Sequence, residues 1–227
     1  MTETGVRATR KLQTRQTLLD AALVLLEQQS LSSLGLREVT RAAGIAPAAF
    51  YRHFADTREL GVALVHEALA SLHAMVADIR GQGVATDEVI ARTVDVIAGY
   101  VRDRRAHLRF LARERHGGVA VVREAIAAEL DLFADELAAD LATRPESSGW
   151  SEPDLRMLAG LYVDQAMLTA TALLEVEPED TAALDRTIET ARAHLRIITL
   201  GRMHWLDDEP AAHADAVASA DPAQDRR

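Results

Sequence analysis

The chain has 227 residues, enough for one large core or for a small domain beside a larger one, and its 48% hydrophobic content with a mean hydropathy of −0.04 argues against disorder. It lacks cysteine, which excludes disulfides, thiolate metal sites and cysteine nucleophiles, and its 4% aromatic content disfavours a sheet-rich fold. The net charge of −10 is unevenly distributed along the chain. Residues 1–60 carry 8 basic and 6 acidic residues, which leaves a net charge of −12 for residues 61–227. A mildly basic head on an acidic body is predicted, and one basic face is sufficient for DNA binding.

The first predicted element is an amphipathic helix over residues 9–28, because Leu18, Ala21, Ala22 and Leu25 recur at helical spacing. Basic residues stand at its start and are suited to phosphates or to a minor groove: Arg7, Arg10, Lys11 and Arg15. The alternative is that they form a solvated basic end.

Two short helices are predicted next, over residues 36–43 and from Pro47 to Phe54. Gly44 supplies the permissive backbone of a tight turn, and Pro47 suits the first position of the second helix. A small core is expected from Leu36, Val39, Ala43, Ile45, Phe50 and Phe54. This is what a helix-turn-helix requires, and it would bring Ala46, Pro47, Ala48 and Ala49 closest to the base edges of DNA, with Tyr51, Arg52 and His53 on the polar face of the second helix.

A long helix is predicted from residue 57 to residue 80, since Asp56 can cap it and Glu59 completes a capping box. Further helices are predicted over residues 87–104, 106–115, 119–143, 152–175 and 181–206, and no strand pattern is found. We therefore expect an all-α fold with a helix-turn-helix DNA-binding domain at 1–56, a ligand-binding and dimerisation bundle at 57–206, and a disordered tail at 207–227.

Enzyme motifs are missing from the sequence, which contains no HExxH, Walker-type loop, dinucleotide fingerprint or G-x-S-x-G. His66 and His73 are one heptad apart, but two histidines rarely hold a metal, so a surface or packing role is favoured. We expect no catalytic activity, no cofactor and no metal. The sequence shows no signal peptide and no spanning segment, which predicts a cytoplasmic protein without a membrane partner.

The segment around the predicted turn resembles the DNA-binding signature of the TetR family of repressors. The resemblance rests on Ala43-Gly44-Ile45, on Phe50-Tyr51-Arg52-His53-Phe54 and on Asp56 to Leu60. Residues 36–39, 44–47 and 110–115 further resemble the branch that represses unsaturated-fatty-acid synthesis and senses acyl thioesters. The resemblance implies a repressor that binds palindromic double-stranded operator DNA as a homodimer.

In such repressors the positions of Tyr51, His53 and Arg58 contact phosphates, and Arg37 could add another contact. The alternative for Tyr51 and His53 is that they are partly buried packing residues. The sequence departs from the family pattern at Gly35, where a Ser or Thr cap is common, and at Ala48 and Ala49, where hydroxyls are usual. Methyl contacts and DNA shape would then carry specificity, which leaves the operator sequence open.

The last two long helices are the candidates for a dimer interface, since each carries an apolar stripe. The stripes are Leu155, Leu158, Tyr162, Ala166 and Ala170, and then Leu184, Ile188, Ala191, Leu195 and Ile198. The alternative is that each stripe faces the core of its own chain.

An effector cavity is expected among the middle helices, where apolar residues suit a fatty chain: Phe110, Leu111, Leu130, Phe133, Leu137, Met157, Leu161 and Met167. Arg109, Arg113 and Arg115 could receive the phosphates of a coenzyme A or acyl carrier protein thioester, unless they pair with neighbouring acids. Two other readings remain open at this stage, a multidrug-type regulator of an efflux gene and a helical ligand carrier that does not bind DNA.

Overall fold

The structure, a computed structural model, describes residues 3–80 and 86–206, with side chains for 8–70 and 88–206. All regular structure in these ranges is helical. The helices are α1 (Glu3–Leu26), η1 (Leu31–Ser33), α2 (Leu36–Ala42), α3 (Pro47–Phe50), α4 (Thr57–Arg80), α5 (Thr86–Asp103), α6 (Arg105–Glu114), α7 (Ala120–Ala142), η2 (Pro145–Ser147), α8 (Glu152–Glu175) and α9 (Thr181–His204). The predicted all-α fold is thereby confirmed.

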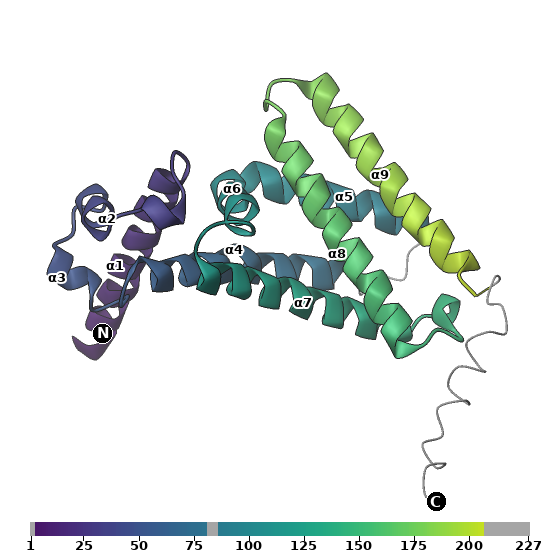
Figure 1. The fold of residues 1–227 in the computed structure, drawn as a ribbon, viewed down its shortest axis with the longest axis horizontal. Coiled ribbons are helices and arrows are strands. Elements are labelled where there is room, and N and C mark those ends of the chain that lie inside the picture. Colours follow the sequence, from purple (N-terminus) through teal and green to yellow (C-terminus); the bar gives the residue numbers. More distant parts are fainter. Residues whose placement is uncertain (1–2, 81–85, 207–227) are drawn as a thin grey trace, which may run out of the picture.

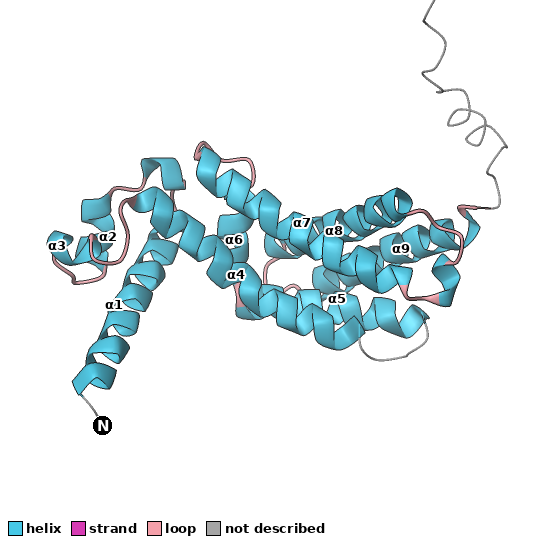
Figure 2. Cartoon of the chain, turned by 90° about the horizontal axis from the view of Figure 1, so that it is seen from below, coloured by secondary structure: helices cyan, strands magenta, loops and turns pink. Residues whose placement is uncertain are grey.

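The chain has a small head and a larger body. The head consists of α1 to α3, and α4 extends from it along the body, with α7 beside it (Figure 1). Viewed from below, α4 and α7 lie in front, and α5, α6, α8 and α9 complete the bundle behind them (Figure 2). Within this bundle α8 contacts α5, α6, α7 and α9, so α8 is the central helix of the body.

Side-chain caps mark the starts of three long helices, α4, α8 and α9. The Asp56 carboxylate accepts hydrogen bonds from the backbone N–H groups of Arg58 and Glu59, both at 2.9 Å, and Glu59 accepts one from the N–H of Ala55. The aspartate cap is as predicted, but Glu59 accepts from the residue before the cap and not from the N–H of Asp56, so the reciprocal bond of a capping box is shifted by one residue. In the body, Ser151 caps α8 and Asp180 caps α9 through backbone N–H groups three residues further on.

The predicted helix-turn-helix core is formed. Gly44 has a φ of 65°, the left-handed conformation that a glycine adopts without strain, and the turn directs α3 away from α2. Val39, Phe50 and Phe54 are fully buried, while Leu36, Ala43 and Ile45 are half-buried and packed against them. The same hydrophobic core continues through α4 into the body, so the head is fastened to the bundle by apolar packing.

The helix boundaries differ from prediction in two places. α1 begins at Glu3 instead of residue 9, and α3 ends at Phe50, after which backbone hydrogen bonds from Arg52, His53 and Phe54 form turns. The remaining helix ends lie within two residues of the predicted ones. The expected tail at 207–227 lies outside the described residues.

One helix among the described residues, α8, is long and apolar enough to cross a membrane by length and composition. The expectation that no segment could span a membrane is therefore not met by length and composition alone. A core helix of a bundle passes the same test, and α8 contacts four other helices of the body.

The end of the body far from the head is closed by two stacked tryptophans. The ring centroids of Trp150 and Trp205 are 5.9 Å apart with planes inclined by 29°. Nearby, the Arg202 guanidinium donates a hydrogen bond of 2.6 Å to the Ser147 hydroxyl. These contacts attach the end of α9 to the loop that precedes α8.

Candidate nucleic-acid interface and effector cleft

The start of α3 is exposed because its other end is anchored. The rings of Phe50 and Phe54 are buried with centroids 5.6 Å apart, and the Arg15 guanidinium lies 5.0 Å from the centroid of Phe54. Ala46, Pro47 and Ala48 consequently face solvent, and Ala49 is half-buried. The four residues predicted to approach base edges thus lie on one short, rigidly held segment.

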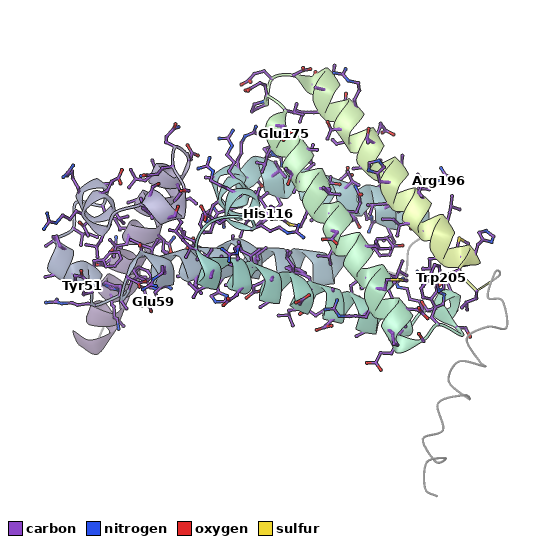
Figure 3. All side chains as sticks on the ribbon, in the orientation of Figure 1. Tyr51, Glu59, His116, Glu175, Arg196 and Trp205 are labelled. Atoms are coloured by element: carbon purple, nitrogen blue, oxygen red, sulfur yellow. The ribbon has the colours of Figure 1, made fainter. Side chains whose placement is uncertain are left out.

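Tyr51 extends from the tip of the head, at the opposite end of the molecule from Trp205 (Figure 3). Its side chain is 63% exposed and meets the edge of the Phe50 ring at a centroid distance of 5.9 Å. Arg52 is also exposed. The alternative of a buried packing role is therefore excluded for Tyr51, whose hydroxyl is free to meet a partner outside the chain.

His53 is half-buried within a group of cations. Its partial burial, followed by the nearby charges of Lys11, Arg15 and Arg52, lowers the pKa of the imidazole below its usual 6.5. Positive charge from α1 therefore meets positive charge from the end of α3, a concentration that favours an anionic partner. Arg15 is one of the basic residues predicted to meet phosphates, and the fold places it beside Phe54 and His53.

The other predicted contacts vary in their surroundings. Arg10, Lys11 and Arg37 are exposed, whereas Arg7 lies outside the residues whose side chains are described. Arg58 is exposed but paired with Asp56, with a guanidinium nitrogen 2.7 Å from a carboxylate oxygen. A phosphate at Arg58 would have to compete with this carboxylate.

The predicted cavity lining does not come together as one wall. Phe110, Leu111, Phe133 and Met167 are buried, and Leu130 and Leu137 are half-buried. By contrast, Met157 and Leu161 are 45% and 50% exposed on the outer face of α8. We correct the prediction for these two residues, because helical periodicity alone does not tell which apolar face of α8 is covered.

The three arginines predicted to receive phosphates, two in α6 and one directly after it, do not form one cluster either. Arg109 is exposed to solvent, while Arg113 donates hydrogen bonds of 2.6 and 2.7 Å to the carbonyls of Leu26 and Gln29 in the head. Arg115 forms an ion pair of 2.9 Å with Asp164 on α8. Arg113 is bound to carbonyls of the head, and Arg115, two positions further on, points in a different direction, so proximity in sequence did not produce a common basic patch.

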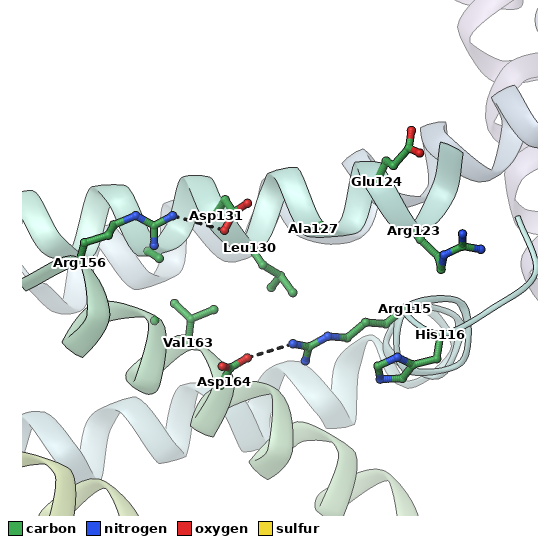
Figure 4. Close-up of a pocket in the computed structure, with 12 residues that line it drawn as sticks. Arg115, His116, Arg123, Glu124, Ala127, Leu130, Asp131, Arg156, Val163 and Asp164 are labelled. Atoms are coloured by element: carbon green, nitrogen blue, oxygen red, sulfur yellow. Dashed lines mark hydrogen bonds and ion pairs between the residues drawn. The ribbon is translucent and has the colours of Figure 1, made fainter. Parts of the chain in front are cut away.

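A cleft of about 440 Å³ lies between α7 and α8 (Figure 4). It is lined by Arg115, His116, Arg123, Glu124, Ala127, Leu130, Asp131, Ala134, Arg156, Gly160, Val163 and Asp164. Two of these residues, Arg115 and Leu130, are among those predicted from the sequence to bind the effector. Arg123 and Arg156 were missed because they lie far apart in sequence, and only the packing of α7 on α8 brings them to one cleft.

The predicted dimer stripes face largely inward. Leu155, Leu158, Ala170, Ala191 and Leu195 are buried in the core of their own chain, and Tyr162, Ala166, Leu184, Ile188 and Ile198 are half-buried against it. A different set of apolar side chains is exposed on these helices: Met157, Leu161 and Leu168 on α8, and Ile197, Leu200 and Met203 on α9. The alternative considered for the stripes, that they pack within their own chain, is therefore the arrangement observed.

Comparison with known proteins supports the interpretation of the head. Residues 18–64 match the family described as bacterial regulatory proteins, tetR family. The head contains a TetR-family N-terminal domain. Its matched segment begins at Leu18 in the last part of α1 and spans α2, the turn at Gly44, α3 and the start of α4.

A relative from Haemophilus influenzae, an uncharacterized HTH-type transcriptional regulator, is 43% identical over 135 residues. These are 59% of this chain and 66% of that protein, so the match spans just under two thirds of the relative. The fold resembles Bacillus subtilis FadR in complex with stearoyl-CoA (TM-score 0.63, 14% identity, 81% of this chain and 96% of that one). It also resembles the fatty acid degradation regulator FadR of Bacillus halodurans (TM-score 0.65, 13% identity, 80% and 94%). The TetR-like architecture thus covers both head and body.

Proposed function

We propose that the chain is a transcription repressor that binds double-stranded operator DNA through the head. The observation that carries this proposal is the exposed start of α3, anchored by buried Phe50 and Phe54 and bordered by the cations around His53. A short exposed helix of this kind enters the major groove in helix-turn-helix proteins. The TetR-family N-terminal domain supports the same assignment.

Phosphate contacts would come from the rim of this segment. Tyr51, Arg52 and His53 are the principal candidates, with Arg10, Lys11 and Arg37 as exposed cations nearby in the head. Arg58 would contribute after exchanging Asp56 for a phosphate. Because Ala46, Pro47, Ala48 and Ala49 have no side-chain donors, base recognition would depend on methyl contacts with thymine and on DNA shape.

The repressor would act as a homodimer, since one helix-turn-helix reads only half of a palindromic site. The exposed apolar residues of α8 and α9 supply the surface for a partner, in place of the stripes predicted from sequence. Half-site spacing would follow from the position of the two heads in this dimer.

The body would bind a small hydrophobic effector, and a fatty acyl thioester is the class that we favour. The support is the fold likeness to a protein whose structure contains stearoyl-CoA, together with a body whose α7–α8 cleft combines apolar and cationic residues. Binding would change DNA affinity only if the two arrangements of the heads differ in affinity for the effector.

Selection of bound sequences from a random double-stranded DNA library tests the central proposal. We expect enrichment of a palindrome, followed by tight binding of the selected site in fluorescence anisotropy. An Ala48→Asp variant should lose at least tenfold in affinity, because a carboxylate would face the groove. Ala128→Asp, an exposed position on α7, carries the same charge change and should bind like wild type. Absence of enrichment, or equal loss in both variants, would contradict the proposal.

A further inference from the structure

Three successive residues at the end of α6 connect the body to the head. Arg113 donates to carbonyls at the end of α1, and Glu114 is 1% exposed and accepts a hydrogen bond of 2.9 Å from the backbone N–H of Leu31 in the head. Arg115 reaches the other way and pairs with Asp164 across the cleft. Arg113 and Glu114 thus form hydrogen bonds with the head, and Arg115 forms an ion pair with the α8 wall of the cleft.

The loop after α6 packs closely against the buried carboxylate of Glu114. One carboxylate oxygen accepts from Leu31, and the second has no hydrogen-bond partner among the described residues. A Cβ atom on Gly117 would overlap this second oxygen, whereas a Cβ atom on Gly118 would make an ordinary contact of 3.6 Å with Ser32. Gly117 is therefore the position where a methyl group displaces Glu114, and Gly118 is its matched control.

The end of the cleft next to α6 is cationic. Arg115, His116 and Arg123 line it from two elements, as Figure 4 shows. Arg123 donates to the carbonyl of Gly117 at 2.7 Å, and within the described part of the chain it forms no ion pair with a carboxylate. Its remaining N–H groups are thus available to an external anion.

The rest of the cleft is mixed in character. Ala127, Leu130 and Val163 give it an apolar stretch, and two of its carboxylates, Asp131 and Asp164, are already paired with arginines. Glu124 lines the cleft as well. The lining therefore suits a ligand with an anionic end and an apolar chain.

We propose that this cleft binds an amphipathic organic anion, with its phosphate or carboxylate between Arg115 and Arg123 and its apolar part along Leu130 and Val163. A bound oxyanion competes with Asp164 for the guanidinium of Arg115, since both are bidentate acceptors. The movement of Arg115 is transmitted to the head by Arg113 and Glu114. The predicted effect on DNA affinity rests on the proposed repressor function. Binding of the anion and the resulting structural change in the head do not depend on that function.

Binding is tested by isothermal titration calorimetry of the full chain with dodecyl phosphate below its micelle concentration. We expect one site per chain and at least tenfold weaker binding in Arg123→Gln, while Arg186→Gln, an exposed arginine on α9, retains wild-type affinity. Inorganic phosphate and dodecyltrimethylammonium are the comparison ligands. Equally tight binding of either one, or an unchanged affinity in Arg123→Gln, would overturn the site.

Transmission is tested by hydrogen exchange without DNA. Dodecyl phosphate should change amide exchange in residues 26–34 at least threefold in wild type and in Gly118→Ala. In Gly117→Ala this change should vanish at a dodecyl phosphate concentration that calorimetry shows to saturate that variant. Glu114→Gln keeps the shape of the side chain and removes its charge. This variant should also reduce the change in amide exchange of residues 26–34, and it replaces Gly117→Ala if that variant does not fold. An undiminished change in both variants, or none in wild type, would overturn the transmission.

A parallel measurement of DNA affinity separates the two proposals. We expect saturation with dodecyl phosphate to alter DNA affinity at least fivefold in wild type and in Gly118→Ala, and less than twofold in Gly117→Ala. A chain that binds no DNA but shows the expected calorimetry and exchange would contradict the repressor function and leave the anion site standing. A chain that binds DNA without any response to dodecyl phosphate would contradict the present inference alone.

Discussion

Tyr51 and His53 stand two positions apart but experience different surroundings. Tyr51 is 63% exposed and its ring is held only at the edge of Phe50, whereas His53 lies among Lys11, Arg15 and Arg52. A hydroxyl in water gives a neutral hydrogen bond, while an imidazole among cations changes its protonation when an anion arrives. The two residues would therefore give different signatures in DNA binding.

Replacement of Tyr51 by Phe should weaken binding to all DNA sequences about fivefold, the equivalent of one hydrogen bond worth about 1 kcal/mol. The slope of log affinity against log salt should stay unchanged, because no charge is lost. Arg52→Gln should lower that slope by about one, since one phosphate contact disappears. Anisotropy titrations at several salt concentrations measure both, and identical slopes in the two variants would contradict these roles.

DNA binding should strengthen as the pH falls. In the free protein the pKa of His53 is held below 6.5, so the ring is neutral at pH 7. A phosphate beside the ring favours the charged form and raises the pKa in the complex, so binding takes up a proton. Affinity should rise as the pH drops through the pKa of the complex and level off below that of the free protein.

The measurement is a series of DNA titrations between pH 8 and pH 5.5. His53→Gln should remove most of the pH dependence, and His66→Gln, at a histidine that pairs with Glu129 on the body, should retain it. A pH profile that is unaltered in His53→Gln would show that the proton taken up on DNA binding is bound by a group other than His53.

At the scale of single elements, Gly61 is a position where α4 lies directly against its neighbours. A Cβ atom there would overlap the side chain of Leu31 and lie 3.0 Å from that of Val122, both of which are buried. Leu31 belongs to the head and Val122 to α7, so the absence of a side chain at Gly61 allows three elements to meet. This contact helps to fix the direction in which α4 leaves the head.

Gly61→Ala should lower the free energy of unfolding by about 1–3 kcal/mol, as overpacking of a core typically does. Gly99→Ala, inside α5 with only an ordinary contact nearby, should instead raise it by about 0.5–1 kcal/mol, because alanine favours helix. Urea denaturation of both variants checks this. A stable Gly61→Ala variant would mean that Leu31 can repack.

The helices were largely predictable because caps and periodicity are local. Asp56 with Glu59 and Gly44 with Pro47 determine where α4 and α3 begin, whatever the rest of the chain does. Which apolar face of α8 is covered depends on α5, α7 and α9, so Met157 and Leu161 were assigned to the interior. The cleft also could not be predicted from the sequence, because Arg123 and Arg156 line one cleft only after α7 packs on α8.

At the scale of the whole molecule, the exposed apolar side chains of α8 and α9 are the surface on which dimerisation would depend. Such residues lose contact with water when a second chain covers them, which favours association. Leu161 and Leu200 are 50% and 48% exposed, so replacing them leaves the core of the monomer intact.

Leu161→Asp combined with Leu200→Asp should convert a dimer into a monomer in sedimentation velocity at micromolar concentration. DNA affinity should fall by at least tenfold, because a single head reads only half of a palindrome. Val121→Asp introduces a charge at an equally exposed apolar residue of α7 and should remain dimeric. A monomeric wild type, or a dimeric double variant, would contradict the assigned face.

The stacked indoles of Trp150 and Trp205 are the two tryptophans of the chain, and they lie at the opposite end of the molecule from Tyr51. Emission excited at 295 nm therefore comes from a single location that operator DNA at the head does not touch. Quenching or a spectral shift on addition of DNA would then report a rearrangement carried along the whole bundle, and the unlabelled protein provides its own optical probe of long-range communication.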